Sequence, residues 1–93
     1  MGQYIIQLTD EAKADLKKHK KVGNKATLTK INKIFEELEI HPFEGIGHPE
    51  PLKYELFGFW SRRINQKDRI VYQLIDKTIV VEVVSASGHY GDK

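Results

Sequence analysis

Residues 59–85 read FWSRRINQKDRIVYQLIDKTIVVEVVS, and this stretch decides the fold. Apolar and polar residues alternate along much of it with the period of two that is typical of β-strands. We expect strands over residues 59–64, 69–75 and 78–85, joined by hairpin turns at 65–68 and 76–77. A further strand is predicted at residues 54–57. The C-terminal half therefore predicts a mainly antiparallel sheet.

The N-terminal half changes to a helical period. After a short predicted strand at residues 4–8, Thr9 is placed to cap a helix that Gly23 and Asn24 should end. Pro42 should end a second helix, whose apolar stripe consists of Leu28, Ile31, Ile34, Phe35 and Leu38. This stripe fits a buried core, and a partner-binding groove is the alternative. We predict an α+β fold, with both helices on one face of the sheet and arginines on the open face.

Size and composition limit the function classes. The 93 residues predict a single domain over residues 1–93. The absence of cysteine excludes disulfides and cysteine-based zinc sites and suits the reducing cytoplasm. No apolar run approaches the length of a membrane span or signal-peptide core, so we expect no membrane partner.

Local charge is more informative than the net charge of +2. Residues 52–69 contain five basic side chains and two acidic ones, interleaved with aromatic residues. Such a mixture fits a surface for phosphates and bases. Ordinary solvated arginines above core aromatics are the alternative.

A loop of glycines and prolines precedes the sheet. Residues 43–53 read FEGIGHPEPLK, and they hold one carboxylate, Glu50, between Pro49 and Pro51. Because each proline fixes its own φ and restricts the residue before it, this loop should be rigid. Further along the chain, alternation directs Arg62 and Arg63 to opposite faces of their strand. The strand register decides which of them shares a face with Arg69, and the sequence leaves both options open.

These residues could together cleave RNA without a metal ion. The reaction needs a base for the 2′-hydroxyl, an acid for the leaving 5′-oxygen and cations for the phosphorane charge. Glu50 is the candidate base and His89 the candidate acid, while Arg69 and Arg63 could hold phosphate oxygens in a planar fork. Tyr90 could stack on a base or donate to phosphate.

Each of these residues also has a simpler interpretation. Glu50 could be an ordinary loop carboxylate, His89 and Tyr90 a frayed terminus, and Arg69 the ion-pair partner of Asp68 or Glu82. His41, His48 and Glu44 lack the helical spacing of metal ligands, so we expect no metal and no cofactor.

In order and spacing, four blocks of the chain resemble the YoeB/Txe family of toxins, within the RelE-like superfamily: PFEGIGHPEPLK at 42–53, GFWSRRI at 58–64, RIVY at 69–72 and HY at 89–90. The resemblance implies a RelE-like fold and an endonuclease that cuts messenger RNA in the A site of the 70S ribosome. The family's catalytic residues match Glu50, Arg69, His89 and Tyr90, and its supporting residues match Lys53 and Arg63. It also implies a YefM-like antitoxin as partner and a homodimer.

Two departures from the family concern the tail. Ser87 and Gly88 stand where members commonly carry a large or basic residue, and residues 91–93 extend beyond the usual final tyrosine. Two rival functions remain open, because a fold does not fix a function. One is a catalytically silent module that binds RNA, the ribosome or an antitoxin, and the other is a protein-binding partner that uses its amphipathic helix.

Overall fold

A computed structural model describes residues 3–75 and 78–88 of the chain. The elements follow in the order β1 (Ile5–Leu8), α1 (Asp10–Val22), α2 (Lys25–Leu38), β2 (Glu50–Pro51), the short 3₁₀ helix η1 (Tyr54–Leu56), β3 (Trp60–Arg63), β4 (Arg69–Leu74) and β5 (Val80–Ser85). The strands form one sheet in the order β1-β5-β4-β3-β2, in which only the β1–β5 pair is parallel. This arrangement confirms the predicted α+β class.

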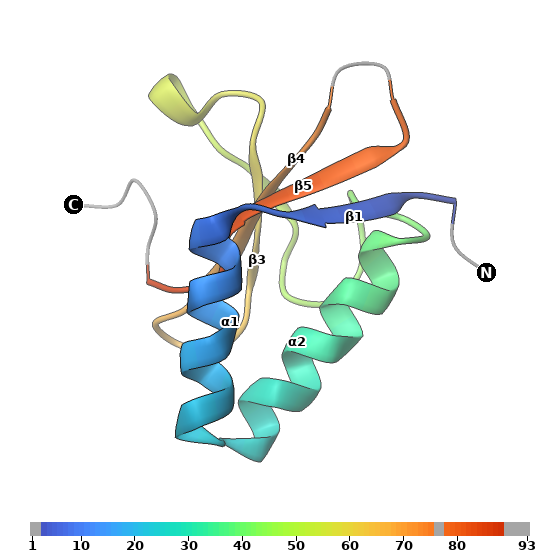
Figure 1. Ribbon diagram of the computed structural model, residues 1–93. Helices are drawn as coiled ribbons and strands as arrows, with labels where there is room; N and C mark the ends of the chain where they lie inside the picture. The colour runs from blue at the N-terminus through green and yellow to red at the C-terminus, as the bar shows by residue number, and fades with distance from the viewer. Residues whose placement is uncertain (1–2, 76–77, 89–93) are drawn as a thin grey trace.

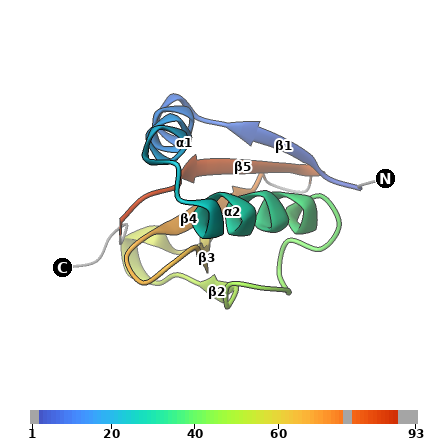
Figure 2. The same cartoon turned by 90° about the horizontal axis from the view of Figure 1, so that it is seen from below.

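Both helices cover the same face of the sheet, as predicted. Figure 2 shows α2 lying across the sheet, with β1 and β2 at its two edges. The core between the layers is apolar and closely packed; its fully buried members include Ile34, Leu38, Ile70, Tyr72 and Val83. Within the described ranges, no helix has the length and apolar composition needed to span a membrane.

Local hydrogen bonds set three of the four helix limits where the sequence predicts them. The Thr9 hydroxyl accepts from the Ala12 N–H at 3.1 Å and caps α1, which ends at Gly23 with a left-handed φ of 75°. The Asn24 side chain then caps α2. That helix ends at Leu38, earlier than the predicted stop at Pro42, and the Ile40 and His41 N–H groups that follow both donate to the Glu37 carbonyl.

Two predictions about the segment before β3 were wrong. Residues 54–57 do not form a strand: Tyr54 has a φ of +58°, which is incompatible with extended backbone, and η1 forms there instead. The strand in this region is β2 at Glu50–Pro51, inside the segment expected to be a loop. A proline is tolerated there because β2 is an edge strand.

The register of β3 and β4 settles which arginines share a face. Arg63 pairs with Arg69, and Arg62 pairs with Ile70. Direct partners in an antiparallel pair point to the same side. Arg69 therefore shares the open face with Arg63, whereas Arg62 points toward the helices and is fully buried. The predicted open face with arginines is confirmed, and of the two options that the sequence leaves open the structure selects Arg63 as the neighbour of Arg69.

Candidate functional site

The short β2 strand brings the loop carboxylate onto the open face. Glu50 pairs with Ser61 of β3, and Ser61 pairs in turn with Val71 of β4. Since Ser61 and Arg63 are two residues apart on β3, Glu50, Arg63 and Arg69 all belong to the face opposite the helices. The structure thus brings together three of the six residues that the sequence singles out.

Arg69 has an unusual position on this face. Its side chain is half-buried, and its Nε is a buried donor without a hydrogen-bond partner among the described residues. Leaving such a donor unpaired costs about 1–3 kcal/mol. A phosphate oxygen would satisfy the donor, because guanidinium groups bind phosphate with charge-assisted hydrogen bonds.

The simpler interpretation of Arg69, as the ion-pair partner of Asp68 or Glu82, is wrong. The Asp68 carboxylate accepts from Gly88 and Asn65, and Glu82 accepts from Gln73 at 2.9 Å. Among residues 3–75 and 78–88, the single ion pair joins Glu37 and Arg62. Within these ranges, Arg69 therefore has no acidic side chain as an ion-pair partner.

The loop that leads to Glu50 is folded around the buried Arg62 guanidinium. Its Nη2 donates to the carbonyls of His41 at 2.9 Å and Glu44 at 2.8 Å, while Nη1 donates to the Glu37 carboxylate at 2.6 Å. The Arg62 Nε donates to the hydroxyl of Tyr72. One side chain of β3 thus fixes the path of residues 41–46.

Glu37 completes this support from α2. Its carboxylate also accepts from the Ile46 N–H at 2.9 Å. Burial alone raises the pKa of this group, but the hydrogen bond from Ile46 and the contact with Arg62 outweigh it, so the pKa of Glu37 lies below its ordinary value. The carboxylate is therefore held in its charged form against the guanidinium.

Two glycines allow the loop to approach this ion pair and the backbone of β3 closely. A Cβ on Gly45 would lie 2.0 Å from the Glu37 Oε1, and a Cβ on Gly47 would lie 2.8 Å from the Arg63 carbonyl. Both glycines have positive φ, at 133° and 82°. The path of this loop therefore depends on the two glycines and on Arg62 as well as on the prolines.

Arg62 is the supporting residue that sequence reasoning missed. The available signal was its position. Arg62 is two residues from Trp60 and from Ile64, so it points to the same side of the strand as these two residues, which face the core. A charge at an inward position of a strand indicates a buried, fully hydrogen-bonded network, since an isolated charge would be too costly there.

Hydrogen bonds hold the backbone of Ala86 and Gly88, just after β5. Asp15 of α1 accepts from the Ala86 N–H at 2.9 Å, and a ring nitrogen of His19 lies 2.7 Å from the Ala86 carbonyl. Asp68, directly before Arg69, accepts from the Gly88 N–H at 3.0 Å. The candidate residues His89 and Tyr90 lie outside the described residues.

Asp68 is buried and remains charged. Burial raises its pKa, but the hydrogen bonds from the Gly88 N–H and from Asn65 prevail and lower the pKa below its ordinary value. Gly88 is therefore tied to a carboxylate one residue away from Arg69.

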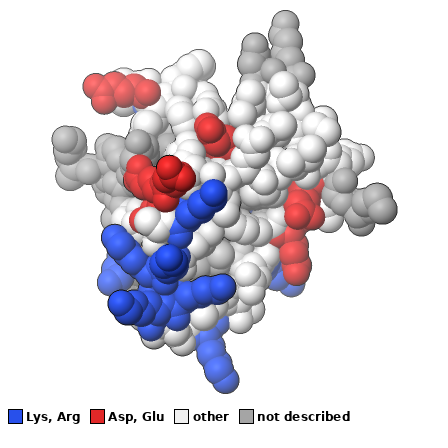
Figure 3. Space-filling view, in the orientation of Figure 1, with Lys and Arg blue, Asp and Glu red and all other residues white. Residues whose placement is uncertain are grey.

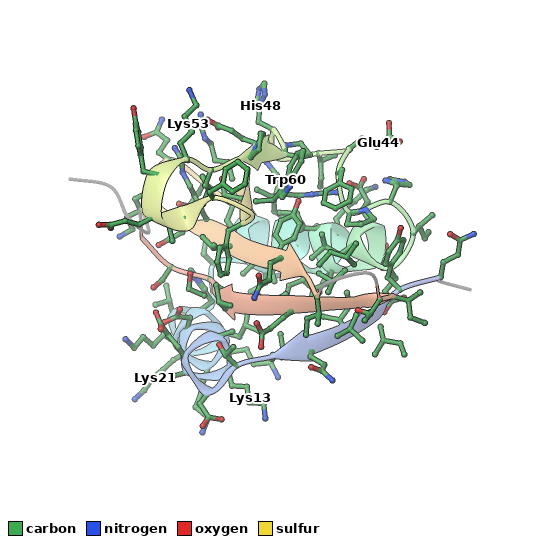
Figure 4. The ribbon with its side chains drawn as sticks, turned by 90° about the horizontal axis from the view of Figure 1, so that it is seen from above. Lys13, Lys21, Glu44, His48, Lys53 and Trp60 are labelled. Carbon is green, nitrogen blue, oxygen red and sulfur yellow. The ribbon has the colours of Figure 1, made fainter. Side chains whose placement is uncertain are left out.

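The remaining candidates lie near β2. Lys53 is exposed directly before η1, and Figure 4 shows it extending outward on the same side of the molecule as His48.

His41, considered as a metal ligand, instead contacts the Glu44 carbonyl through its Nδ1 at 2.9 Å. Residues 3–75 and 78–88 contain no group of three His, Cys, Asp or Glu side chains that could hold a metal ion.

Comparisons with known proteins point to one family of bacterial toxins. The sequence model of a family described as YoeB-like toxin of bacterial type II toxin-antitoxin system matches residues 8–90. A curated relative, Toxin YoeB of Synechocystis sp., is 43% identical over 68 residues, which cover 73% of this chain and 77% of the relative.

Solved structures extend the likeness to almost the whole chain. A YoeB/ParE toxin from Agrobacterium tumefaciens superimposes with a TM-score of 0.83 at 31% identity, covering 92% of this chain and 99% of that one. A YoeB dimer from Staphylococcus aureus gives 0.79 at 34% identity, covering 95% and 99%. The YoeB-YefM complex from the same organism gives 0.78 at 35%, covering 94% and 98%.

Proposed function

This chain belongs to the YoeB-like toxins of bacterial type II toxin–antitoxin systems, and from that membership we propose that it is a ribosome-dependent endonuclease of messenger RNA. The observation that carries the proposal is the shared open face of Glu50, Arg63 and Arg69, with the unpaired buried donor of Arg69 among them. A carboxylate and two guanidinium groups on one face supply the base and the cations that cleavage of a phosphodiester needs.

The proposed reaction is general acid–base catalysis without a metal ion. Glu50 accepts the proton of the ribose 2′-hydroxyl, whose oxygen attacks the neighbouring phosphorus while the bond to the 5′-oxygen breaks. Arg69 and Arg63 hold the phosphate oxygens, and His89 donates a proton to the departing 5′-oxygen. Lys53 and Tyr90 contact the substrate beside the reacting phosphate.

The proposed partners follow from the same membership. A YefM-like antitoxin binds and neutralises the chain, and two copies form a homodimer, as the related Staphylococcus aureus structures indicate. The ribosomal substrate places the protein in the cytoplasm.

The test of this function is a map of message cleavage on programmed ribosomes. In a purified translation system, the wild-type chain should produce new 5′ ends within the codon in the A site. The upstream fragments should end in a 2′,3′-cyclic phosphate or a 3′-phosphate, because the 2′-oxygen is the nucleophile. A 3′-hydroxyl end would contradict this mechanism, and ribosome binding without any cleavage would favour the silent binding module.

Arg69→Lys tests the role of the guanidinium. Lysine keeps the positive charge but has no N–H at the position of the buried Nε and no planar fork. We expect cleavage to slow roughly 30-fold, equivalent to about 2 kcal/mol of transition-state stabilisation. Single-turnover rates on programmed ribosomes measure the effect, with ribosome affinity as the control. A wild-type rate would mean that charge alone suffices at this position.

A further inference from the structure

The connection between β2 and β3 carries two exposed aromatic rings. Among the large apolar side chains that the structure describes, Tyr54 and Phe57 are the most exposed, at 90% and 83%. Tyr54 begins η1 and Phe57 directly follows it, and the Phe57 N–H donates to the Tyr54 carbonyl at 3.0 Å. Because this hydrogen bond closes one turn, the two residues lie close together. The fold therefore leaves a pair of neighbouring rings in solvent.

Backbone hydrogen bonds hold this turn in place. The Leu52 N–H donates to the Phe59 carbonyl at 2.9 Å, which continues the pairing of β2 with β3. The Phe59 N–H donates in turn to the Leu56 carbonyl at 2.9 Å. Tyr54 has a φ of +58°, a left-handed conformation that bulky residues rarely adopt and that occurs preferentially at binding sites. The turn therefore presents its rings in a fixed place relative to β2.

The rings lie on the same side of the sheet as the proposed cleavage site. Figure 1 shows η1 (yellow) projecting from the sheet on the side opposite α1 and α2, the side to which Glu50 also belongs. Tyr54 is four residues beyond Glu50 in the chain. Four residues span at most about 14 Å, which is the length of about four stacked nucleotides. A message whose reacting phosphate lies at Glu50 therefore has neighbouring bases within reach of the rings.

Net charge contributes little at this turn. Lys53 and Glu55, on either side of Tyr54, are both exposed and carry opposite charges. Figure 3, in the orientation of Figure 1, shows Lys and Arg side chains gathered over the helices rather than over η1. A surface that bound only phosphates would need an excess of positive charge. The turn instead offers aromatic rings beside a single cation.

Two kinds of partner could cover these rings, and the residues around the rings distinguish them. A protein partner would bury an apolar patch, but the residues that flank the two rings are Lys53, Glu55 and Gly58, all exposed. Unpaired nucleobases need only the faces of the rings, since every base can stack on an aromatic side chain. We propose that Tyr54 and Phe57 bind, by stacking, nucleobases of the message next to the cleaved phosphate. This inference rests on the proposed function, because it assigns a subsite for the same substrate.

The first test measures RNA binding away from the ribosome and requires no cleavage. The probe is a fluorescent single strand of about ten 2′-O-methyl nucleotides, which lack the attacking hydroxyl, and fluorescence anisotropy gives its affinity. The Y54L/F57L variant keeps apolar side chains but removes both rings. We expect it to lose at least about tenfold in affinity, equivalent to about 1.4 kcal/mol. The Y54W/F57W variant keeps aromatic faces and should stay within about threefold of wild type.

Two controls separate stacking from other causes. The V22A/I79A variant removes apolar side chains that are also exposed but lie outside η1, and its affinity should stay within about twofold of wild type. A probe with abasic sites throughout should bind the wild type and Y54L/F57L equally, because it has no base to stack. Melting temperatures confirm that every variant is folded.

Cleavage on programmed ribosomes then tests the place of the rings in the reaction. The Y54L/F57L variant should need about tenfold more protein to reach its half-maximal single-turnover rate. Its maximum rate should stay within about threefold of wild type, because Glu50 and Arg69 are unchanged. A lower maximum rate with an unchanged half-saturating concentration would contradict a binding role for the rings.

Three results of the binding test would overturn the proposal: no binding of the probe to the wild type, equal affinities of the wild type and Y54L/F57L, or the same loss in Y54L/F57L with the abasic probe. Equal affinities of the leucine and tryptophan variants would assign the surface to an apolar protein partner instead. A failure of the proposed function gives a different result. The wild type would then bind the probe through its rings but would cleave no message on the ribosome.

Discussion

Glu50→Gln should slow message cleavage by about 10²–10⁴-fold, the usual contribution of a general base. Glutamine keeps the size of the side chain and its place on β2, but it cannot accept the 2′-hydroxyl proton. Glu50 is exposed at the sheet edge, so the change should leave the fold and the melting temperature intact. Single-turnover cleavage on programmed ribosomes measures the loss.

Glu44→Gln is the matched control for this experiment. Glu44 is an exposed carboxylate of the same loop, and it supports Arg62 through its backbone carbonyl rather than its side chain. Its cleavage rate should stay close to wild type. A Glu50→Gln variant that cleaves as fast as this control would remove Glu50 from the mechanism, while normal ribosome binding by both variants would show that only chemistry had been tested.

Arg62→Ala should destabilise the protein by about 3–5 kcal/mol, because it leaves a partly buried carboxylate on Glu37 without its partner. The carbonyls of His41 and Glu44 lose their donors at the same time. Small domains are typically stable by only about 5–15 kcal/mol, so this single change removes a large part of the total. Denaturant unfolding followed by circular dichroism measures the loss.

The neighbouring arginine provides the comparison. Arg63→Ala removes an exposed side chain and should alter stability by no more than about 0.5 kcal/mol. Adding Glu37→Leu to Arg62→Ala should recover part of the lost stability, since the uncompensated charge is then gone. Similar losses of stability for Arg62→Ala and Arg63→Ala would show that the buried network around Arg62 does not stabilise the fold more than an exposed arginine does.

The sequence predicts the helices and long strands because their signals are local. Helical periodicity, the cap at Thr9 and the break at Gly23 depend on neighbours within a few residues, and the structure confirms each of them. The segment around η1 defeats the same reasoning. Tyr54 adopts a positive φ, which cannot be predicted from a tyrosine. The apolar residues that follow it therefore resemble a strand in the sequence, but they form a 3₁₀ turn in the structure.

The residue types of the candidate site stand out in the sequence, but their arrangement in space does not. Glu50 and Arg69 stand out by their surroundings in the sequence, yet whether they meet depends on a two-residue strand and on the register of a hairpin. A shift of one residue would have moved Arg69 to the opposite face. The supporting role of Arg62 depends on contacts with residues up to 25 positions away, which no local pattern contains.

The parallel pairing of β1 with β5 has a consequence for how the protein is made. The first strand pairs with the last, so that Ile5 lies beside Val80, and β5 fills the place between β1 and β4. During synthesis from the N-terminus, β1 has no partner in the sheet until β5 has been made, more than 70 residues later. Contacts between such distant residues also slow folding, because a long loop must close first. Each newly made molecule should therefore complete this sheet late, after β5 has been synthesised.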